Sequence, residues 1–153
     1  MTSRIHADFR YDATTTSVYT SLEQVLQQRS GVCQDLAHIE VGCFRAMGLA
    51  ARYVSGYLLT HPPPGRPKLI GADASHAWIA VFFGDSGWVD FDPTNNLSPI
   101  DEHITLAWGR DYSDVCPIEG VYVGGGASTL TVQVDVQSLS DEEYGSSPGP
   151  VDV

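Results

Sequence analysis

The segment 33-CQDLAHIEVGCFRAM-47 restricts the fold of this chain more than any other stretch. Its apolar side chains occupy two faces of the predicted helix, so most of the helix surface is apolar. Such a helix is stable only where other elements cover it on several sides. Gly48 predicts its end, because glycine after the last helical turn commonly caps a helix. We therefore expect a central helix buried in the middle of a domain.

Strand patterns dominate the sequence after this helix. Residues 51–59 and 76–83 are rich in β-branched and aromatic side chains, and 88–93 follow the short turn 84–87. Residues 129–136 alternate apolar and polar side chains, which predicts a half-buried antiparallel strand. Because helices come first and strands follow, the predicted class is α+β, with the central helix packed on an antiparallel sheet.

A shorter helix is expected before the central one. Thr20 with Glu23 and Ser21 with Gln24 both fit a capping box, and Gly31 marks the end of this helix. Its apolar stripe consists of Leu22, Val25 and Leu26.

The chain length of 153 residues suits one domain. We expect this domain over 1–137, with an extended lead-in over 1–19 and a disordered acidic tail over 138–153. The Pro/Gly-rich segment 60–75 predicts a loop, and the stretch around 108-WGRDYSD-114 predicts irregular structure.

The charge balance limits the partners of this chain. Eight basic and nineteen acidic residues give a net charge of −11, which argues against nucleic acid and anionic membranes. No apolar run approaches the roughly 20 residues that span a bilayer, and the first residues lack a signal-peptide core. Three widely spaced cysteines argue against a disulfide scaffold or a C-x-x-C zinc site. Reduced thiols therefore predict a cytoplasmic location.

Cys33 begins the central helix and is a candidate nucleophile. A helix N-terminus carries partial positive charge and unpaired N–H groups, and both favour a thiolate. The alternative is a structural cysteine, which is what we expect of Cys43 on an apolar face of the same helix. A catalytic role requires an imidazole that takes the thiol proton and a third group that orients the imidazole.

His76 is the best-placed histidine for this role. It opens a predicted strand directly after a Pro/Gly loop, whereas His38 lies inside the buried helix and is expected to be a core histidine. The tight turn of the predicted hairpin places position 94 opposite His76, so a nearby aspartate can hold the imidazole. Asp90 and Asp92 share a strand face and both remain candidates. Asp92 lies nearer and is preferred.

Four motifs together resemble the transglutaminase-like superfamily, in its bacterial transglutaminase-like cysteine-peptidase branch. They are GVCQDLAH (31–38), ARYVSGYL (51–58), SHAWIAVFF (75–83) and GWVDFDPTNN (87–96), with weaker support from GRDYSDVCPIEGVYVGGG (109–126). The resemblance covers roughly residues 20 to 137. It implies a papain-like core and a Cys-His-Asp triad that falls on Cys33, His76 and Asp92.

The resemblance also implies what this chain lacks. Members of this branch often carry an additional N-terminal β-rich domain, and residues 1–19 are too few to form one, so such a domain is expected to be missing. Animal transglutaminases carry calcium sites, but this sequence has no EF-hand loop or oxygen-rich cluster. No metal or other cofactor is therefore expected.

The implied chemistry is acyl transfer from a peptide or isopeptide amide through a Cys33 thioester. Hydrolysis is the expected outcome, and protein-glutamine transglutaminase crosslinking is the alternative. A non-catalytic peptide-binding module is an interpretation of a different class. Gln34, which follows the nucleophile, and Trp78, on the His76 strand, are the candidate substrate-binding residues. The sequence indicates neither the identity of the peptide or protein substrate nor the oligomeric state.

Overall fold

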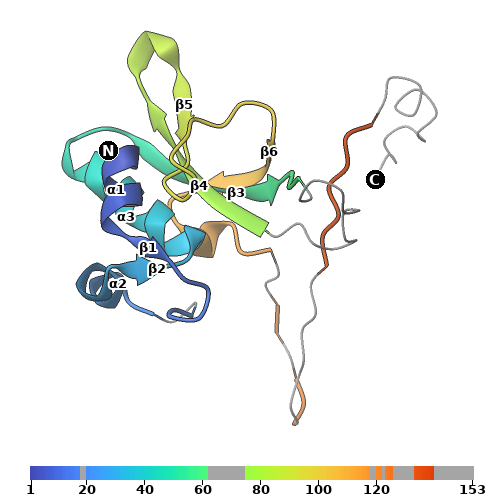
Figure 1. The fold of residues 1–153 in the computed structure, drawn as a ribbon. Coiled ribbons are helices and arrows are strands. Elements are labelled where there is room, and N and C mark those ends of the chain that lie inside the picture. The colour runs from blue at the N-terminus through green and yellow to red at the C-terminus, as the bar shows by residue number, and fades with distance from the viewer. Residues whose placement is uncertain (18–19, 62–74, 118–119, 122, 126–132, 140–153) are drawn as a thin grey trace.

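The computed structural model contains a four-stranded antiparallel sheet with its helices gathered on one side (Figure 1). It describes residues 1–17, 20–61, 75–117, 120–121, 123–125 and 133–139. The strand order is β5-β4-β3-β6. The strands are β3 (Ala51–Leu58), β4 (Ser75–Phe82), β5 (Trp88–Phe91) and β6 (His103–Gly109). This arrangement confirms the expected α+β class.

The central helix α3 (Cys33–Ala46) is covered on two sides, as its apolar pattern predicts. One side packs on the sheet through Ala37, Val41 and Phe44, which contact Ala77, Ile79 and Val81 of β4. The other side packs against the N-terminal helices through Leu36 and Ile39. The helix stops before Gly48, whose φ of 81° favours glycine.

The N-terminal segment is folded, so the expectation of an extended lead-in over 1–19 is wrong. It forms helix α1 (Thr2–Asp8) and strand β1 (Arg10–Tyr11). A seven-residue helix is only marginally stable in water by itself. Ile5 of α1 is buried in a cluster with Val25, Leu36 and Ile39, and this tertiary contact supplies the missing stability.

Helix α2 (Leu22–Gln28) uses the Ser21–Gln24 capping box. It ends earlier than Gly31 predicts, because Arg29 takes a left-handed φ of 53° and Ser30–Gly31 form β2, which pairs in parallel with β1. Val25 is completely buried, whereas Leu22 and Leu26 are 41% and 46% exposed. The predicted apolar stripe is therefore wrong for these two leucines.

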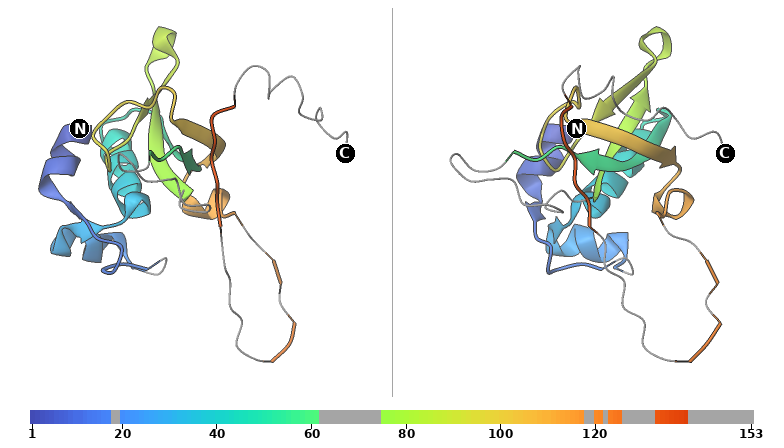
Figure 2. Two further views of the ribbon diagram at one scale, coloured as in Figure 1. Left: turned by 45° about the vertical axis from the view of Figure 1, so that its right-hand side comes forward. Right: turned by 90° about the vertical axis from the view of Figure 1, so that its right-hand side faces the viewer.

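The β4–β5 hairpin has the predicted register, and its turn projects from the sheet (Figure 2). Ile79 pairs with Phe91, so the same register carried onward places position 94 opposite His76. A 3-10 turn, η1 (Gly84–Ser86), connects the strands. Gly84 and Gly87 have φ values of 56° and 70°, which only glycine adopts at little cost.

Strand β6 forms an edge of the sheet where the sequence predicted irregular structure. The chain then turns through η2 (Tyr112–Asp114), where the Arg110 guanidinium donates two hydrogen bonds to Asp114 and the Arg110 backbone N–H donates a third. The Tyr112 N–H donates to His38 Nε2 at 3.2 Å. His38 thus anchors this turn on α3, in keeping with a hydrogen-bonded core histidine.

Three expectations lie for half or more of their length outside the described residues: the 60–75 loop, the 129–136 strand and the 138–153 tail. Among the helices that are described, none has the length and apolar character needed to cross a membrane.

Candidate active site

Cys33 is the first residue of α3, and the turn before it is tightly held. The buried Asp35 carboxylate accepts hydrogen bonds from the Val32 N–H at 2.9 Å and the Thr16 hydroxyl at 2.7 Å. A Cβ atom on Gly31 would lie 2.6 Å from Asp35 Oδ2, so this close approach requires glycine. The GVCQD motif therefore has a local physical role: it holds the start of α3 and with it the Cys33 thiol.

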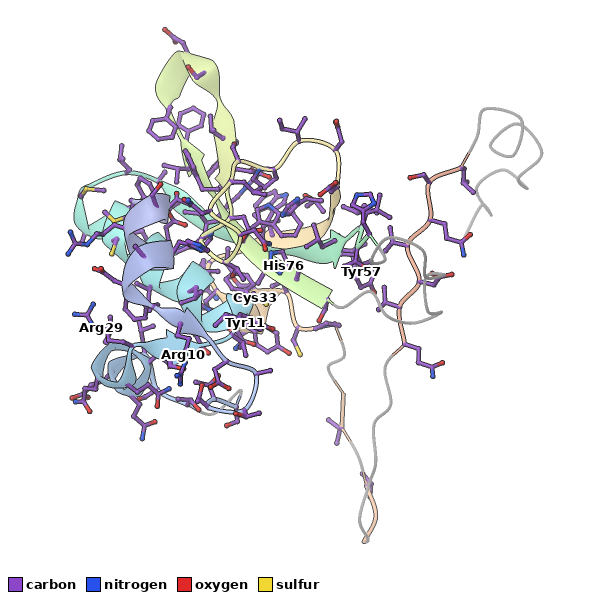
Figure 3. The ribbon with its side chains drawn as sticks, viewed as in Figure 1. Arg10, Tyr11, Arg29, Cys33, Tyr57 and His76 are labelled. Atoms are coloured by element: carbon purple, nitrogen blue, oxygen red, sulfur yellow. The ribbon has the colours of Figure 1, made fainter. Side chains whose placement is uncertain are left out.

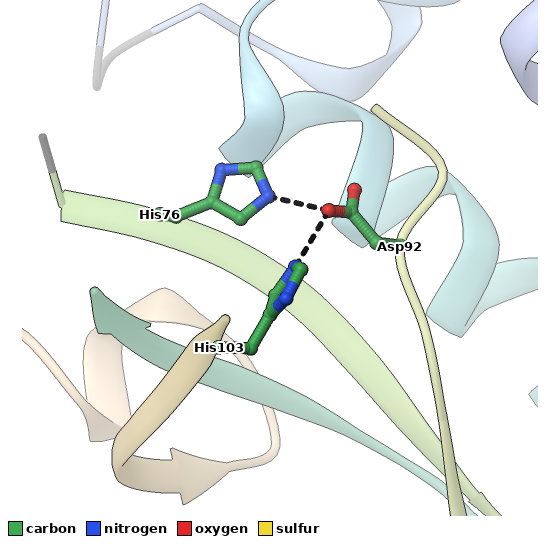
Figure 4. Close-up of side chains that lie close together, drawn as sticks. All are labelled: His76, Asp92 and His103. Carbon is green, nitrogen blue, oxygen red and sulfur yellow. Dashed lines mark hydrogen bonds and ion pairs between the residues drawn. The ribbon is translucent and has the colours of Figure 1, made fainter. Parts of the chain in front are cut away.

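His76 and Asp92 form a buried hydrogen-bonded pair (Figure 4). His76 Nε2 lies 2.8 Å from Asp92 Oδ2, and their side chains are 8% and 0% exposed. Asp92 Oδ1 accepts from the backbone N–H groups of Thr94 and Asn95, at 2.9 and 3.1 Å. The residue beside His76 is therefore Asp92, as preferred. Asp90 instead accepts a hydrogen bond from Trp78 Nε1 at 3.0 Å.

The electrostatics of the pair favour a charged imidazolium and a charged carboxylate. Burial opposes protonation of His76, but hydrogen bonds and charge from Asp92 and from the neighbouring Cys33 raise its pKa to about 9. Burial likewise opposes ionisation of Asp92, but the hydrogen bond and charge of His76, then His103 and Asn95, hold its pKa well below the usual range. Cys33 lies close to His76 (Figure 3). Because Asp92 occupies Nε2, Nδ1 is the ring nitrogen left for the thiol.

His103 is a site residue that the sequence reasoning missed. Its Nε2 lies 2.9 Å from Asp92 Oδ2, and its side chain is 3% exposed (Figure 4). The ring meets Trp78 edge-on, with centroids 5.0 Å apart. The sequence signal for this residue was the segment 103-HITLAWG-109, whose β-branched and aromatic side chains favour a strand. This segment forms β6, and the side chain of its first residue, His103, is buried.

The side chains of His76, Asp92 and His103 are of the types that bind divalent metals, and their donor atoms lie within 4.8 Å of one another. Both Nε2 atoms, however, are hydrogen-bonded to Asp92 Oδ2, which also accepts from Asn95 Nδ2 at 2.7 Å. Because the atoms that would bind a metal already form hydrogen bonds to one another, we interpret the cluster as a hydrogen-bond network.

The two candidate substrate-binding residues differ in position. Trp78 is completely buried, with its ring stacked 6.0 Å from that of His76, so it has no surface to offer a substrate and that expectation is wrong. Gln34 is partly exposed and lines a groove of about 370 Å³ along α3, together with His38 and Arg45. Its contact with substrate stays a prediction.

Tyr11 is a second residue near the thiol that the sequence reasoning missed (Figure 3). It pairs with Gly31 across β1 and β2 and is 54% exposed. Burial raises its pKa, and negative charge at Cys33 adds to the shift, so the phenol and the thiol are close. The sequence analysis expected residues 1–19 to be extended, so it did not place Tyr11 beside Cys33.

Comparisons with known proteins show the family and the fold of this chain. Residues 1–93 match the family description of the transglutaminase-like superfamily. An uncharacterized protein of Mycobacterium tuberculosis, Rv2569c, is 45% identical over 141 residues, which are 89% of this chain and 45% of that protein. A candidate cysteine protease from Cytophaga hutchinsonii, known from its crystal structure, shares the fold with a TM-score of 0.62 and 31% identity, over 75% of this chain and 36% of that one.

The fold is that of papain-like proteins, with a helix packed on an antiparallel sheet. This chain belongs to the transglutaminase-like superfamily. It spans less than half the length of the mycobacterial relative. A protein-glutamine gamma-glutamyltransferase of Pseudomonas aeruginosa is 35% identical over 72 residues, which are 46% of this chain and 11% of that enzyme.

Proposed function

We propose that this chain is a cysteine-nucleophile amidase or peptidase that acts on peptide or isopeptide amides. The observation that supports it is the buried His76–Asp92 hydrogen bond beside Cys33, with the pKa of His76 raised to about 9. An imidazole with that pKa is protonated at neutral pH and pairs with a thiolate, which is the nucleophilic form of cysteine.

In the proposed mechanism, the Cys33 thiolate attacks the amide carbonyl and forms a tetrahedral intermediate. The backbone N–H at the start of α3 stabilises its oxyanion. Imidazolium His76 protonates the leaving amine, and the thioester forms as the C–N bond breaks. Asp92 keeps the ring oriented throughout. His76, now neutral, takes a proton from water, which attacks the thioester and releases the acid.

Transfer to an amine is the second candidate, and the similarity to the Pseudomonas aeruginosa gamma-glutamyltransferase favours it. The acyl-enzyme would be the same in both reactions. The acceptor alone differs, since a primary amine then attacks the thioester in place of water.

The test uses a library of fluorogenic peptide amides and a glutamine-containing peptide, each with and without a fluorescent primary amine. Acid release without the amine supports hydrolysis, and incorporation of the amine supports transglutamination. Both activities must be lost in Cys33→Ala and retained in Cys43→Ala. Cys43 is a matched control because it lies in the same helix but packs against the cluster formed by Ile5, Val25, Leu36 and Ile39. Peptide binding that survives Cys33→Ala, with no turnover by the parent protein, would refute the enzyme and leave a binding module.

A further inference from the structure

His103 and His76 reach the same carboxylate oxygen from two different strands. We propose that His103 is a positioning residue, whose hydrogen bond to Asp92 Oδ2 holds the carboxylate in the plane that orients His76. This inference rests on the proposed function, because orientation of His76 matters only if His76 serves Cys33.

The donors around Asp92 divide into two groups. Oδ1 is held by backbone N–H groups of the turn that follows Asp92, those of Thr94 and Asn95. Oδ2 accepts from His76, from Asn95 Nδ2 and from His103. Of these three donors, only His103 belongs to β6, which lies at the opposite edge of the sheet from β5. It therefore ties the orientation of the carboxylate to an element other than its own turn.

The contact defines the tautomer of His103. A carboxylate with a strongly lowered pKa has no proton to donate, so it only accepts. His103 must therefore carry its proton on Nε2 to form the 2.9 Å contact. This is a property of the parent protein that can be measured directly.

The backbone is shaped to bring His103 to this place. The pairing of β3 with β6 shifts between Ser55 and Gly56, and Gly56 lies against both β6 and Trp78. A Cβ atom at Gly56 would overlap the Ile104 carbonyl oxygen and lie 2.7 Å from the Trp78 ring. The absence of a side chain at Gly56 thus lets β6 approach Trp78 and places the preceding His103 against Asp92.

Burial makes this hydrogen bond matter more than a surface contact. The side chains of His76, Asp92 and His103 are at most 8% exposed, and the completely buried Trp78 packs against both imidazole rings. In such an environment, water cannot replace a lost donor, and the loss of a hydrogen bond to a charged group has a large effect.

The first test measures the alkylation rate of Cys33 by iodoacetamide at pH 6 in two variants. His103→Phe keeps an aromatic ring but loses the donor, and we expect the rate and kcat to fall about 10- to 100-fold. We expect KM to change less than about threefold, since His103 does not touch substrate. His103→Gln keeps an N–H donor and should restore the rate to within about threefold of the parent.

The matched control is His61→Phe. His61 also lies beside a carboxylate, with Nε2 2.7 Å from Glu102 Oε1, but both side chains of this pair are exposed. It should leave alkylation unchanged. Parent-like rates in a folded His103→Phe protein, or equal losses in His103→Phe and His103→Gln, would overturn the positioning role.

A second measurement needs no variant. Nitrogen-15 NMR of the histidine rings in the parent protein should find His103 protonated at Nε2, and a neutral ring protonated only at Nδ1 would refute the inference. The proposed function fails separately: slow, ordinary alkylation of Cys33 in the parent would reject the nucleophile, whatever the tautomer of His103.

Discussion

Asp90 and Asp92 lie two residues apart on one side of the chain but accept hydrogen bonds from different rings: Asp90 from Trp78 and Asp92 from His76. Their substitution should therefore have different effects. We expect Asp92→Asn to lower kcat about 100-fold or more, because the amide neither stabilises the imidazolium nor selects its tautomer. Steady-state kinetics on any amide substrate found for the parent, or Cys33 alkylation at pH 6, measures this loss.

Asp90→Asn is the matched control for that prediction. An asparagine oxygen can still accept from Trp78 Nε1, so activity should stay within about threefold of the parent. Similar losses in both variants would show that the two aspartates act on the site in the same way.

The stability of the protein should depend on pH through His76. Its folded pKa of about 9 lies above the ordinary 6.5, so the folded state binds this proton more tightly than the unfolded state does. The resulting stabilisation is complete below about pH 6.5 and is lost as pH rises through about 9. Urea unfolding of the parent and of His76→Gln at pH 6 and pH 9.5 should show a free-energy difference that shrinks at the higher pH. A difference independent of pH would contradict the raised pKa.

Glu40 should destabilise the fold at neutral pH through its charge. Its carboxyl is completely buried and accepts from Thr2 at 2.7 Å, while its Oε2 atom has no hydrogen-bond partner among the residues that the structure describes. Burial raises its pKa, so the folded state binds the proton more tightly and loses stability as pH rises above the ordinary 4.5. We expect Glu40→Gln to be more stable than the parent at pH 7, with a smaller gain at pH 4. A variant less stable at pH 7 would show that the buried charge is compensated.

Helix α1 should contribute to global stability, although it is short. Ile5→Ala removes a side chain that is only 4% exposed, so we expect a loss of about 2–4 kcal/mol in the free energy of unfolding. Arg4→Ala, in the same helix, breaks an exposed pair with Asp8 and should change this free energy by less than about 1 kcal/mol. Urea unfolding measures both values, and equal effects would mean that α1 does not dock through Ile5.

Local patterns in the sequence predicted a large part of the fold. The limits of α3 follow from its apolar spacing and Gly48, and the register of the β4–β5 hairpin follows from the length of its turn. Side chains in these elements are arranged by helical and strand periods that a short stretch contains in full. The proximity of Asp92 to His76 followed from the same arithmetic, while the catalytic roles of Cys33, His76 and Asp92 stay predictions.

The sequence by itself determined the buried helix, the hairpin and the family motifs, because each depends on residues close together in the chain. Only the tertiary structure decided that Thr2–Asp8 is a helix, that Tyr11 reaches Cys33 and that His103 joins Asp92. The physical reason is that short elements such as α1, β1 and β2 are stable only through packing or pairing with distant segments. Trp78 shows the same limit, since its burial depends on strands from several parts of the chain.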